Sequence, residues 1–263
     1  MHIVVLVKPT PDIERVRFDV ERGVVDRSSA ELEINPLDLY AIEIAVRIKE
    51  KLGGTVTAIS MAPPHGEKAL RDAIARGVDR AILLTDRRFA GADTLATSYT
   101  LASAIKKLGH FDLIVCGEKS VDGDTGQVGP EIAEHLGIPH TSYVVEVKEV
   151  EKDRIVVVSD LGNAYYLLKL KLPALISVTK EVAIPRKPKF KDVLRARKAM
   201  IEVWSADDLK DVIDLNRIGL MGSPTRVVKA YYAFEKGREG IVVKGEEGIR
   251  KFIELLKAEG VIR

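Results

Sequence analysis

The first half of the sequence alternates between short, continuously aliphatic runs and longer segments with helical periodicity. An aliphatic run without polar alternation is typical of a strand that is buried on both faces of a sheet. Such runs are expected to form strands at 3–7, 55–60, 80–85 and 113–116. Helical patterns follow them, at 36–52, 67–76, 93–107 and 130–136. Strands and helices in this alternation favour an α/β fold with a doubly wound, mostly parallel sheet.

The pattern changes after Pro139, where strands follow one another with short polar turns. These additional strands are expected at 144–150, 154–160, 164–170 and 175–179. Prolines and basic residues then mark an exposed connector that leads into a short basic helix. From residue 205 onward the alternation weakens, and only Gly245–Glu259 again has a helical pattern. We therefore expect one α/β domain over 1–204 and a C-terminal arm over 205–263 that packs on a partner, with a subdomain of the same core as the alternative.

Composition limits the classes of function that the chain can have. Its 41 basic and 39 acidic residues give a net charge of +2, which excludes the strongly basic surface of a dedicated nucleic-acid-binding protein. The only cysteine, Cys116, cannot form an intramolecular disulfide and indicates a reducing compartment. No apolar run is long enough to span a bilayer, and the first is too short for the core of a signal peptide. We expect a cytoplasmic protein with no direct membrane insertion.

The loop Gly117–Pro130 is the most informative segment for ligand binding. Ligands of open parallel sheets bind outside the carboxyl ends of the strands, and this loop leaves such an end and enters a helix N-terminus, which favours phosphate. Asp122 and Asp124 can accept hydrogen bonds from a ribose. Three glycines let backbone amides approach a ligand closely: Gly123, Gly126 and Gly129. The alternative is a polar turn that only caps a helix, because the loop matches neither the dinucleotide fingerprint nor the P-loop.

A second candidate is the start of the helical pattern at 93–107. Asp93 is a plausible N-cap, and the hydroxyl groups of Thr94 and Thr97 lie on one face of the first turn. This face suits a diphosphate; the alternative is capping with two exposed threonines. The chain has no nucleophile elbow, and its five histidines show no metal-ligand spacing. The residues thus predict a nucleotide-binding α/β domain without a protein-derived catalyst or metal; a Rossmann-like, adenine-nucleotide-binding fold is what the resemblance described next implies.

Several segments at these loops resemble the beta subunit of electron-transfer flavoprotein. The resemblance covers residues 1–203 well and the rest loosely. The common Lys-Gln-Val-Pro-Asp of the family is replaced by Lys-Pro-Thr-Pro-Asp at 8–12, and Leu39 stands where an acidic or polar residue is often found. The segments that carry the resemblance are 7–12, 35–38, 41–43, 56–61, 76–81, 117–130 and 170–174.

The resemblance implies a heterodimer in which an alpha subunit holds a redox FAD. Most beta subunits of the family hold AMP, whereas a subset resembling electron-bifurcating flavoproteins holds a second FAD. The segments Pro63–His65, Asp86–Thr97 and Gly222–Thr225 resemble that subset. They imply an FAD that accepts a hydride from NADH and passes electrons singly to the alpha-subunit FAD and to a low-potential acceptor such as ferredoxin. Two alternatives stay open: an AMP-holding carrier subunit with a structural and docking role, and a stand-alone adenine-nucleotide enzyme.

The resemblance also implies which residues meet partners and the cofactor. The segment 179–198 matches the family's recognition loop, which docks acyl-CoA dehydrogenases or quinone-linked oxidoreductases, and its basic composition suits an acidic surface. The arm 205–263 is expected to pack on the alpha subunit. The expected cofactor-binding residues, which include the diphosphate candidates above, are Leu6, Asn35, Pro36, Leu37, Asp38, Met61, Asp93, Thr94, Thr97, Gly117, Asp122, Gly123, Asp124, Thr125, Gly126, Gln127 and Val128.

Overall fold

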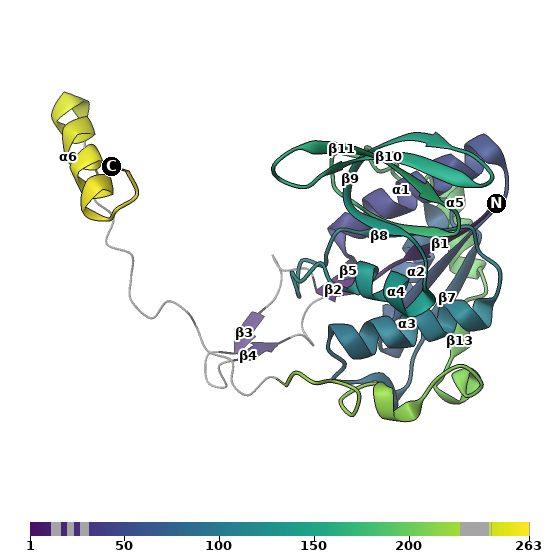
Figure 1. Cartoon of the computed structure of the whole chain (residues 1–263). Coiled ribbons are helices and arrows are strands. Elements are labelled where there is room, and N and C mark those ends of the chain that lie inside the picture. Colours follow the sequence, from purple (N-terminus) through teal and green to yellow (C-terminus); the bar gives the residue numbers. More distant parts are fainter. Residues whose placement is uncertain (12–16, 20–23, 27–31, 227–241, 243, 263) are drawn as a thin grey trace.

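One nine-stranded sheet forms the centre of the molecule (Figure 1). The structure is a computed structural model that describes residues 1–262 except 12–16, 20–23, 27–31, 227–241 and 243. Within the described residues, the strands follow one another across the sheet in the order β11 (Tyr165–Lys171), β10 (Arg154–Asp160), β9 (His140–Val150), β12 (Ala174–Val178), β8 (Leu113–Gly117), β1 (His2–Leu6), β6 (Thr55–Met61), β7 (Arg80–Leu84) and β13 (Glu202–Trp204).

The parallel part of the sheet is built from the aliphatic runs of the first half of the sequence. β1 pairs in parallel with β6 and with β8, and β6 pairs in parallel with β7. All five residues of β8 are buried, as expected of a strand that is covered on both faces. The predicted doubly wound, mostly parallel α/β fold is therefore confirmed, and the four predicted strands differ from the observed ones by at most one residue at either end.

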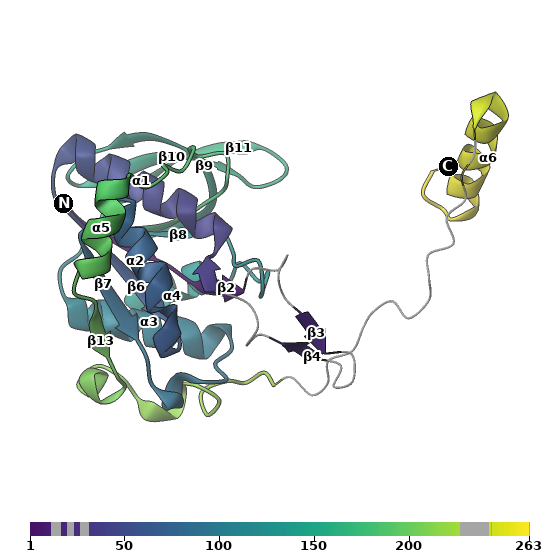
Figure 2. The same ribbon diagram turned by 180° about the vertical axis from the view of Figure 1, so that it is seen from behind.

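Helices cover both faces of this sheet (Figures 1 and 2). Successive residues of β1 point to opposite sides, so that Ile3 belongs to one buried apolar cluster and Val4 to the other. The first cluster is completed by α1 (Pro36–Leu52), α2 (Glu67–Ala75) and α5 (Phe190–Lys198). The second is completed by α3 (Thr94–Leu108) and α4 (Val128–Leu136).

The predicted later strands extend the sheet at one edge. β9, β10 and β11 form an antiparallel meander, whereas β12 lies between β9 and β8 and is parallel to both. Along β10, buried residues alternate with half-buried ones, as in an antiparallel sheet with one solvent-facing side. The meander predicted from the short polar turns is confirmed.

Short elements escaped the sequence analysis because three residues carry too little periodicity. β2 (Pro9–Pro11) pairs with β5 (Leu32–Ile34), and β3 (Arg17–Asp19) pairs with β4 (Val24–Asp26). β13 was also not predicted, although it completes the sheet beside β7. The short 3-10 helices are η1 (Pro64–Gly66), η2 (Arg87–Phe89), η3 (Asp207–Leu209) and η4 (Leu215–Arg217).

The described residues after β13 do not behave uniformly. Ala206, Leu209 and Ile218 are buried in the apolar cluster under α3 and α4, so the first part of the segment 205–263 packs on the domain itself. The predicted C-terminal helix is confirmed as α6 (Gly245–Ala258). Its apolar residues Ile249 and Phe252 are 61% and 54% exposed. Packing of an arm on a partner stays a prediction.

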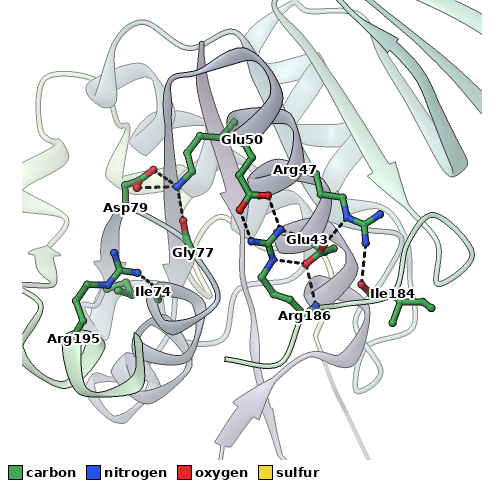
Figure 3. Close-up of polar contacts among 10 residues, drawn as sticks. Glu43, Arg47, Glu50, Ile74, Gly77, Asp79, Ile184, Arg186 and Arg195 are labelled. Carbon is green, nitrogen blue, oxygen red and sulfur yellow. Dashed lines mark hydrogen bonds and ion pairs between the residues drawn. The ribbon is translucent and has the colours of Figure 1, made fainter. Parts of the chain in front are cut away.

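Arginine side chains fasten the segment 184–199 to α1 and α2 (Figure 3). Arg186 donates hydrogen bonds from its side chain to Glu43, which is almost fully buried, and to Glu50, which is exposed. Arg47 donates a further hydrogen bond to Glu43. Burial alone would raise the pKa of Glu43, but the hydrogen bonds from Arg186 and Arg47 outweigh it and lower the pKa below its usual value. Glu43 is therefore ionised and paired at neutral pH.

We expect Glu43→Gln to lower the free energy of unfolding at pH 7 by about 1.5–3 kcal/mol, the value of hydrogen bonds to a charged group. The matched control is Glu50→Gln, which removes an exposed carboxylate from the same guanidinium and should cost less than about 1 kcal/mol. Because the pKa of Glu43 is lowered on folding, its contribution is lost as pH falls through the folded pKa, and the two variants should converge there. Urea unfolding curves at pH 7 that are the same for wild type and Glu43→Gln would contradict this role of Glu43.

Candidate functional site

A cavity of about 1090 Å³ opens at the carboxyl ends of the central parallel strands. It is lined by residues that follow β1, β6, β7 and β8 along the chain, together with side chains from α1 and α3. This is the position at which open α/β sheets bind ligands. Its volume lies just above the range of about 300–1,000 Å³ that is usual for small-molecule and cofactor sites.

Most of the predicted cofactor-binding residues meet in this cavity. Those that line it are Leu6, Asp38, Met61, Asp93, Thr94, Thr97, Gly117, Asp122, Gly123, Thr125, Gly126, Gln127 and Val128. The cavity lining does not include Asn35, Pro36, Leu37 or Asp124. The structure thus brings most of the predicted residues together in one cavity, whereas contact of any of them with a cofactor stays a prediction.

Asn35 does not line the cavity but forms hydrogen bonds to residues next to it. Its amide Nδ2 donates to Asp38 Oδ1 at 2.9 Å and to the carbonyl oxygen of Lys119 at 2.9 Å. Its Oδ1 accepts a hydrogen bond from the backbone N–H of Val121 at 3.2 Å. One buried amide therefore joins the start of α1 to the glycine-rich loop, which is a structural role that the predicted ligand contact did not include.

Asp38 is the second buried connector at this point. Its Oδ2 accepts a hydrogen bond from the backbone N–H of Lys8 at 2.8 Å, so that the loop after β1 is held against α1. Burial raises the pKa of Asp38 to about 7, although the hydrogen bonds from Lys8, Asn35 and Gly117 act in the opposite direction. Around neutral pH the charge of this carboxyl group therefore changes at the edge of the cavity.

Gly117 shows why a side chain is excluded where β8 meets α1. A Cβ atom at this position would lie 2.6 Å from Asp38 Oδ1 and 2.9 Å from the carbonyl carbon of Leu37. The close approach of the two backbones, and with it the geometry of the Asp38 contacts, requires glycine. Gly126 has a φ of +67°, and its Cβ would point toward the Tyr143 hydroxyl, 3.5 Å away, so this glycine is required by its backbone conformation.

Two helix N-termini face the same cavity. Asp93 caps α3, since its Oδ1 accepts a hydrogen bond from the backbone N–H of Ala96 at 3.0 Å. Thr94 Oγ1 lies 3.1 Å from Gln127 Oε1, so the first turn of α3 touches the loop that enters α4. The threonine face of α3 therefore lies beside the loop 117–130. Converging helix N-termini are suited to phosphate groups, because free N–H groups and the helix dipoles favour negative charge.

The aspartates that were expected to meet a ribose carry lysine partners. Lys8 Nζ lies 2.7 Å from Asp122 Oδ1 and donates to Ser120 Oγ at 3.1 Å. Lys119 Nζ lies 2.7 Å from Asp124 Oδ1. Lys8 and Lys119 line the cavity, and the list of predicted site residues missed both of them. For Lys8 the signal was its position directly after the first strand.

Further lining residues were outside the predicted list. Pro63 and Pro64 follow β6, and Arg87 and Phe89 belong to the loop after β7. Both loops leave the carboxyl ends of parallel strands, where ligands of such sheets bind, and both belong to the segments that resemble the FAD-holding subset. In the part of the chain that the structure describes, no group of three His, Cys, Asp or Glu side chains is arranged to hold a metal ion. None of the described helices is long and apolar enough to cross a membrane.

Comparison with known proteins agrees with this architecture. The sequence pattern of the electron transfer flavoprotein domain matches residues 22–209. The chain belongs to the electron transfer flavoprotein family. Proteins similar to it over the whole of both chains include the electron transfer flavoprotein subunits beta of Thermoanaerobacterium thermosaccharolyticum, with 44% identity over 265 residues, and Clostridium acetobutylicum, with 42% over 263 residues. The acryloyl-CoA reductase electron transfer subunit gamma of Anaerotignum propionicum is 37% identical over 269 residues, again over both full chains.

In this flavoprotein-family chain the raised pKa of Asp38 gives a prediction with a definite sign. Because folding raises the pKa from 3.8 to about 7, the folded chain binds more protons than the unfolded chain between these values. This carboxyl group therefore lowers stability as pH rises through that window and has no further effect above it. The carboxyl carbon signal of Asp38, assigned with Asp38→Asn, should titrate near pH 7 by NMR. The control is Asp93, whose pKa is lowered on folding. A normal titration of Asp38 near pH 4 would contradict the prediction.

Proposed function

We propose that this chain is the beta subunit of a heterodimeric electron-transfer flavoprotein and holds an FAD in the cavity at the carboxyl ends of β1, β6, β7 and β8. In this proposal the FAD accepts a hydride from NADH, and the electrons pass singly to the FAD of the alpha subunit and to a low-potential acceptor such as ferredoxin. Membership of the family and the similarity to proteins named electron transfer flavoprotein subunit beta support the assignment as a beta subunit.

The FAD assignment is based on the meeting of two helix N-termini in one large cavity. Thr94 and Thr97 of α3 line this cavity of about 1090 Å³, and so do Gln127 and Val128 at the start of α4. A diphosphate carries more negative charge and more acceptor oxygens than a monophosphate, and two helix dipoles together with the hydroxyl donors of Thr94 and Thr97 match it. AMP has fewer than half of the atoms of FAD and would leave much of this volume to water.

The remaining lining suits the other parts of the cofactor. Lys8 and Lys119 add positive charge, while Asp122 can share its second oxygen with a ribose hydroxyl because Lys8 contacts Oδ1. Met61, a half-buried apolar residue of the lining, offers surface for a flat ring. Bound FAD would supply the hydride and single-electron chemistry, whereas the residues of this chain bind it, orient it and exclude water.

The alternative of an AMP-holding carrier subunit keeps one supporting observation. Hydrogen bonds join Asn35 to Asp38 and to the loop 117–130, and an adenosine monophosphate bound beside this connection would not need the rest of the volume. In this case the chain would have a structural and docking role. If the cavity retains FAD, the FAD-holding function is favoured; if it retains AMP, the carrier function is favoured.

Partners follow from the same proposal. The apolar residues of α6, with Ile249 61% exposed, would pack on the alpha subunit, because an amphipathic helix needs an apolar partner surface. The segment 179–198 would dock an acyl-CoA dehydrogenase or a quinone-linked oxidoreductase. A relative named acryloyl-CoA reductase electron transfer subunit gamma supports a partner of the acyl-CoA type.

We expect the double variant Thr94→Val and Thr97→Val to lose at least about tenfold in FAD affinity, since a lost hydrogen bond to a charged group costs about 1.5–3 kcal/mol. Valine keeps the shape of threonine and removes only the hydroxyl groups. AMP, with one phosphate, should be affected less. FAD fluorescence titration of the heterodimer with its alpha subunit measures the change.

The control for this variant lies on the same helix. Ser103 also carries a hydroxyl group on α3, but it donates to the carbonyl oxygen of Tyr99 at 2.8 Å and does not line the cavity. Ser103→Ala should therefore keep the wild-type FAD affinity. FAD binding that is the same in wild type, the double variant and the control would remove α3 from the cofactor site.

A further inference from the structure

The segment 218–225, here called the latch segment, packs against the loop that follows β7. The backbone N–H of Leu220 donates to the carbonyl oxygen of Ala90 at 3.0 Å. A Cβ atom on Gly219 would lie 1.9 Å from the carbonyl oxygen of Arg88, so the two backbones are in direct contact there. The loop between β7 and α3 thus lines the cavity and also contacts the latch segment.

Asp93 is where the latch segment reaches the helix that faces the cavity. The backbone N–H of Asp93 donates to Ser223 Oγ at 2.9 Å. Asp93 Oδ2 accepts two hydrogen bonds from Thr225, one from its backbone N–H at 3.2 Å and one from its hydroxyl group at 2.9 Å. Asp93 therefore uses one carboxylate oxygen to cap α3 through Ala96 and the other to hold the latch segment.

Ser223 is itself fixed by its surroundings. It is only 7% exposed, and its hydroxyl group donates to the carbonyl oxygen of Gly219 at 2.7 Å, which leaves an oxygen lone pair for the N–H of Asp93. Burial would raise the pKa of Asp93, but hydrogen bonds from Ala96 and Thr225 outweigh it and hold the pKa below its usual value. Asp93 is thus ionised, and its contacts with Thr225 are charge-assisted.

Neither hydroxyl group of the latch segment belongs to the cavity. Asp93, Thr94 and Thr97 line it, whereas Ser223 and Thr225 do not. A contact with the nucleotide therefore does not explain their hydrogen bonds. Their consequence is the fixed position of the residue that begins α3, and so of the first turn that carries Thr94 and Thr97.

We infer that Ser223 and Thr225 are positioning residues of the nucleotide cavity: by holding Asp93 they fix the first turn of α3 where it meets the second phosphate of the ligand. This inference rests on the proposed function. Preorganised donors bind more tightly than donors that must be ordered on binding. The latch segment thereby becomes a determinant of affinity for a nucleoside diphosphate.

The test compares two substitutions at one position in the full-length chain. Thr225→Val removes the hydroxyl donor to Asp93 and keeps the shape, while Thr225→Ser keeps the donor. ADP and AMP are the probes, because they differ by one phosphate, and calorimetric titration gives both affinities. We expect Thr225→Val to lower the ratio of ADP to AMP affinity by about fivefold, a coupling of the size seen between residues of one hydrogen-bond network. Thr225→Ser should retain the wild-type ratio.

Ser223→Ala is the second variant, because it removes the acceptor for the N–H of Asp93 at a different residue, and it should lower the same ratio. Melting temperatures separate a local effect from unfolding, since a purely structural role would weaken both nucleotides alike. An unchanged ratio in folded Thr225→Val and Ser223→Ala would overturn the inference if Thr94→Val still weakens ADP. If Thr94→Val has no effect on ADP, the diphosphate site of the proposed function fails, and the inference fails with it.

Discussion

The buried contact between Asp38 and its donors joins the parts of the chain from which the cavity is built. Asp38 accepts hydrogen bonds from the backbone of Lys8 and from the amide of Asn35, and Asn35 in turn holds the backbone at Lys119 and Val121. The loops after β1 and β8 are thereby fixed to the start of α1, at the edge of the sheet where parallel strands leave their carboxyl ends free for ligands. The close approach at Gly117 is the steric condition for this arrangement.

Local patterns were sufficient for the central sheet and the main helices. Continuous aliphatic runs such as Ile3–Val7 can satisfy their surroundings only as strands covered on both faces, and Pro36 and Gly53 mark the ends of α1. The position of the glycine-rich loop and of the threonine face of α3 at one cavity also followed from the order of strands and helices. β13 could not be predicted in the same way, because its three residues become a strand only through pairing with β7.

The sequence was less informative about how site residues act on one another. Asn35 and Asp122 were both expected to meet the nucleotide, and this contact stays a prediction. The structure adds that Asn35 holds the backbone at Lys119 and that Asp122 is paired with Lys8. These contacts join residues far apart in the chain, and such contacts cannot be predicted from the local periodicity of the sequence. The same holds for Ser223 and Thr225, whose hydrogen bonds to Asp93 place part of the weakly patterned C-terminal segment against the cavity loop.

We propose that this chain holds a second FAD in its cavity, and the nucleotide content of the purified heterodimer with its alpha subunit is the most direct test. Acid releases bound nucleotides, and chromatography separates and counts them. We expect two FAD for each heterodimer and no AMP. One FAD together with one AMP would contradict it and would identify the chain as the AMP-holding subunit of a simple electron carrier.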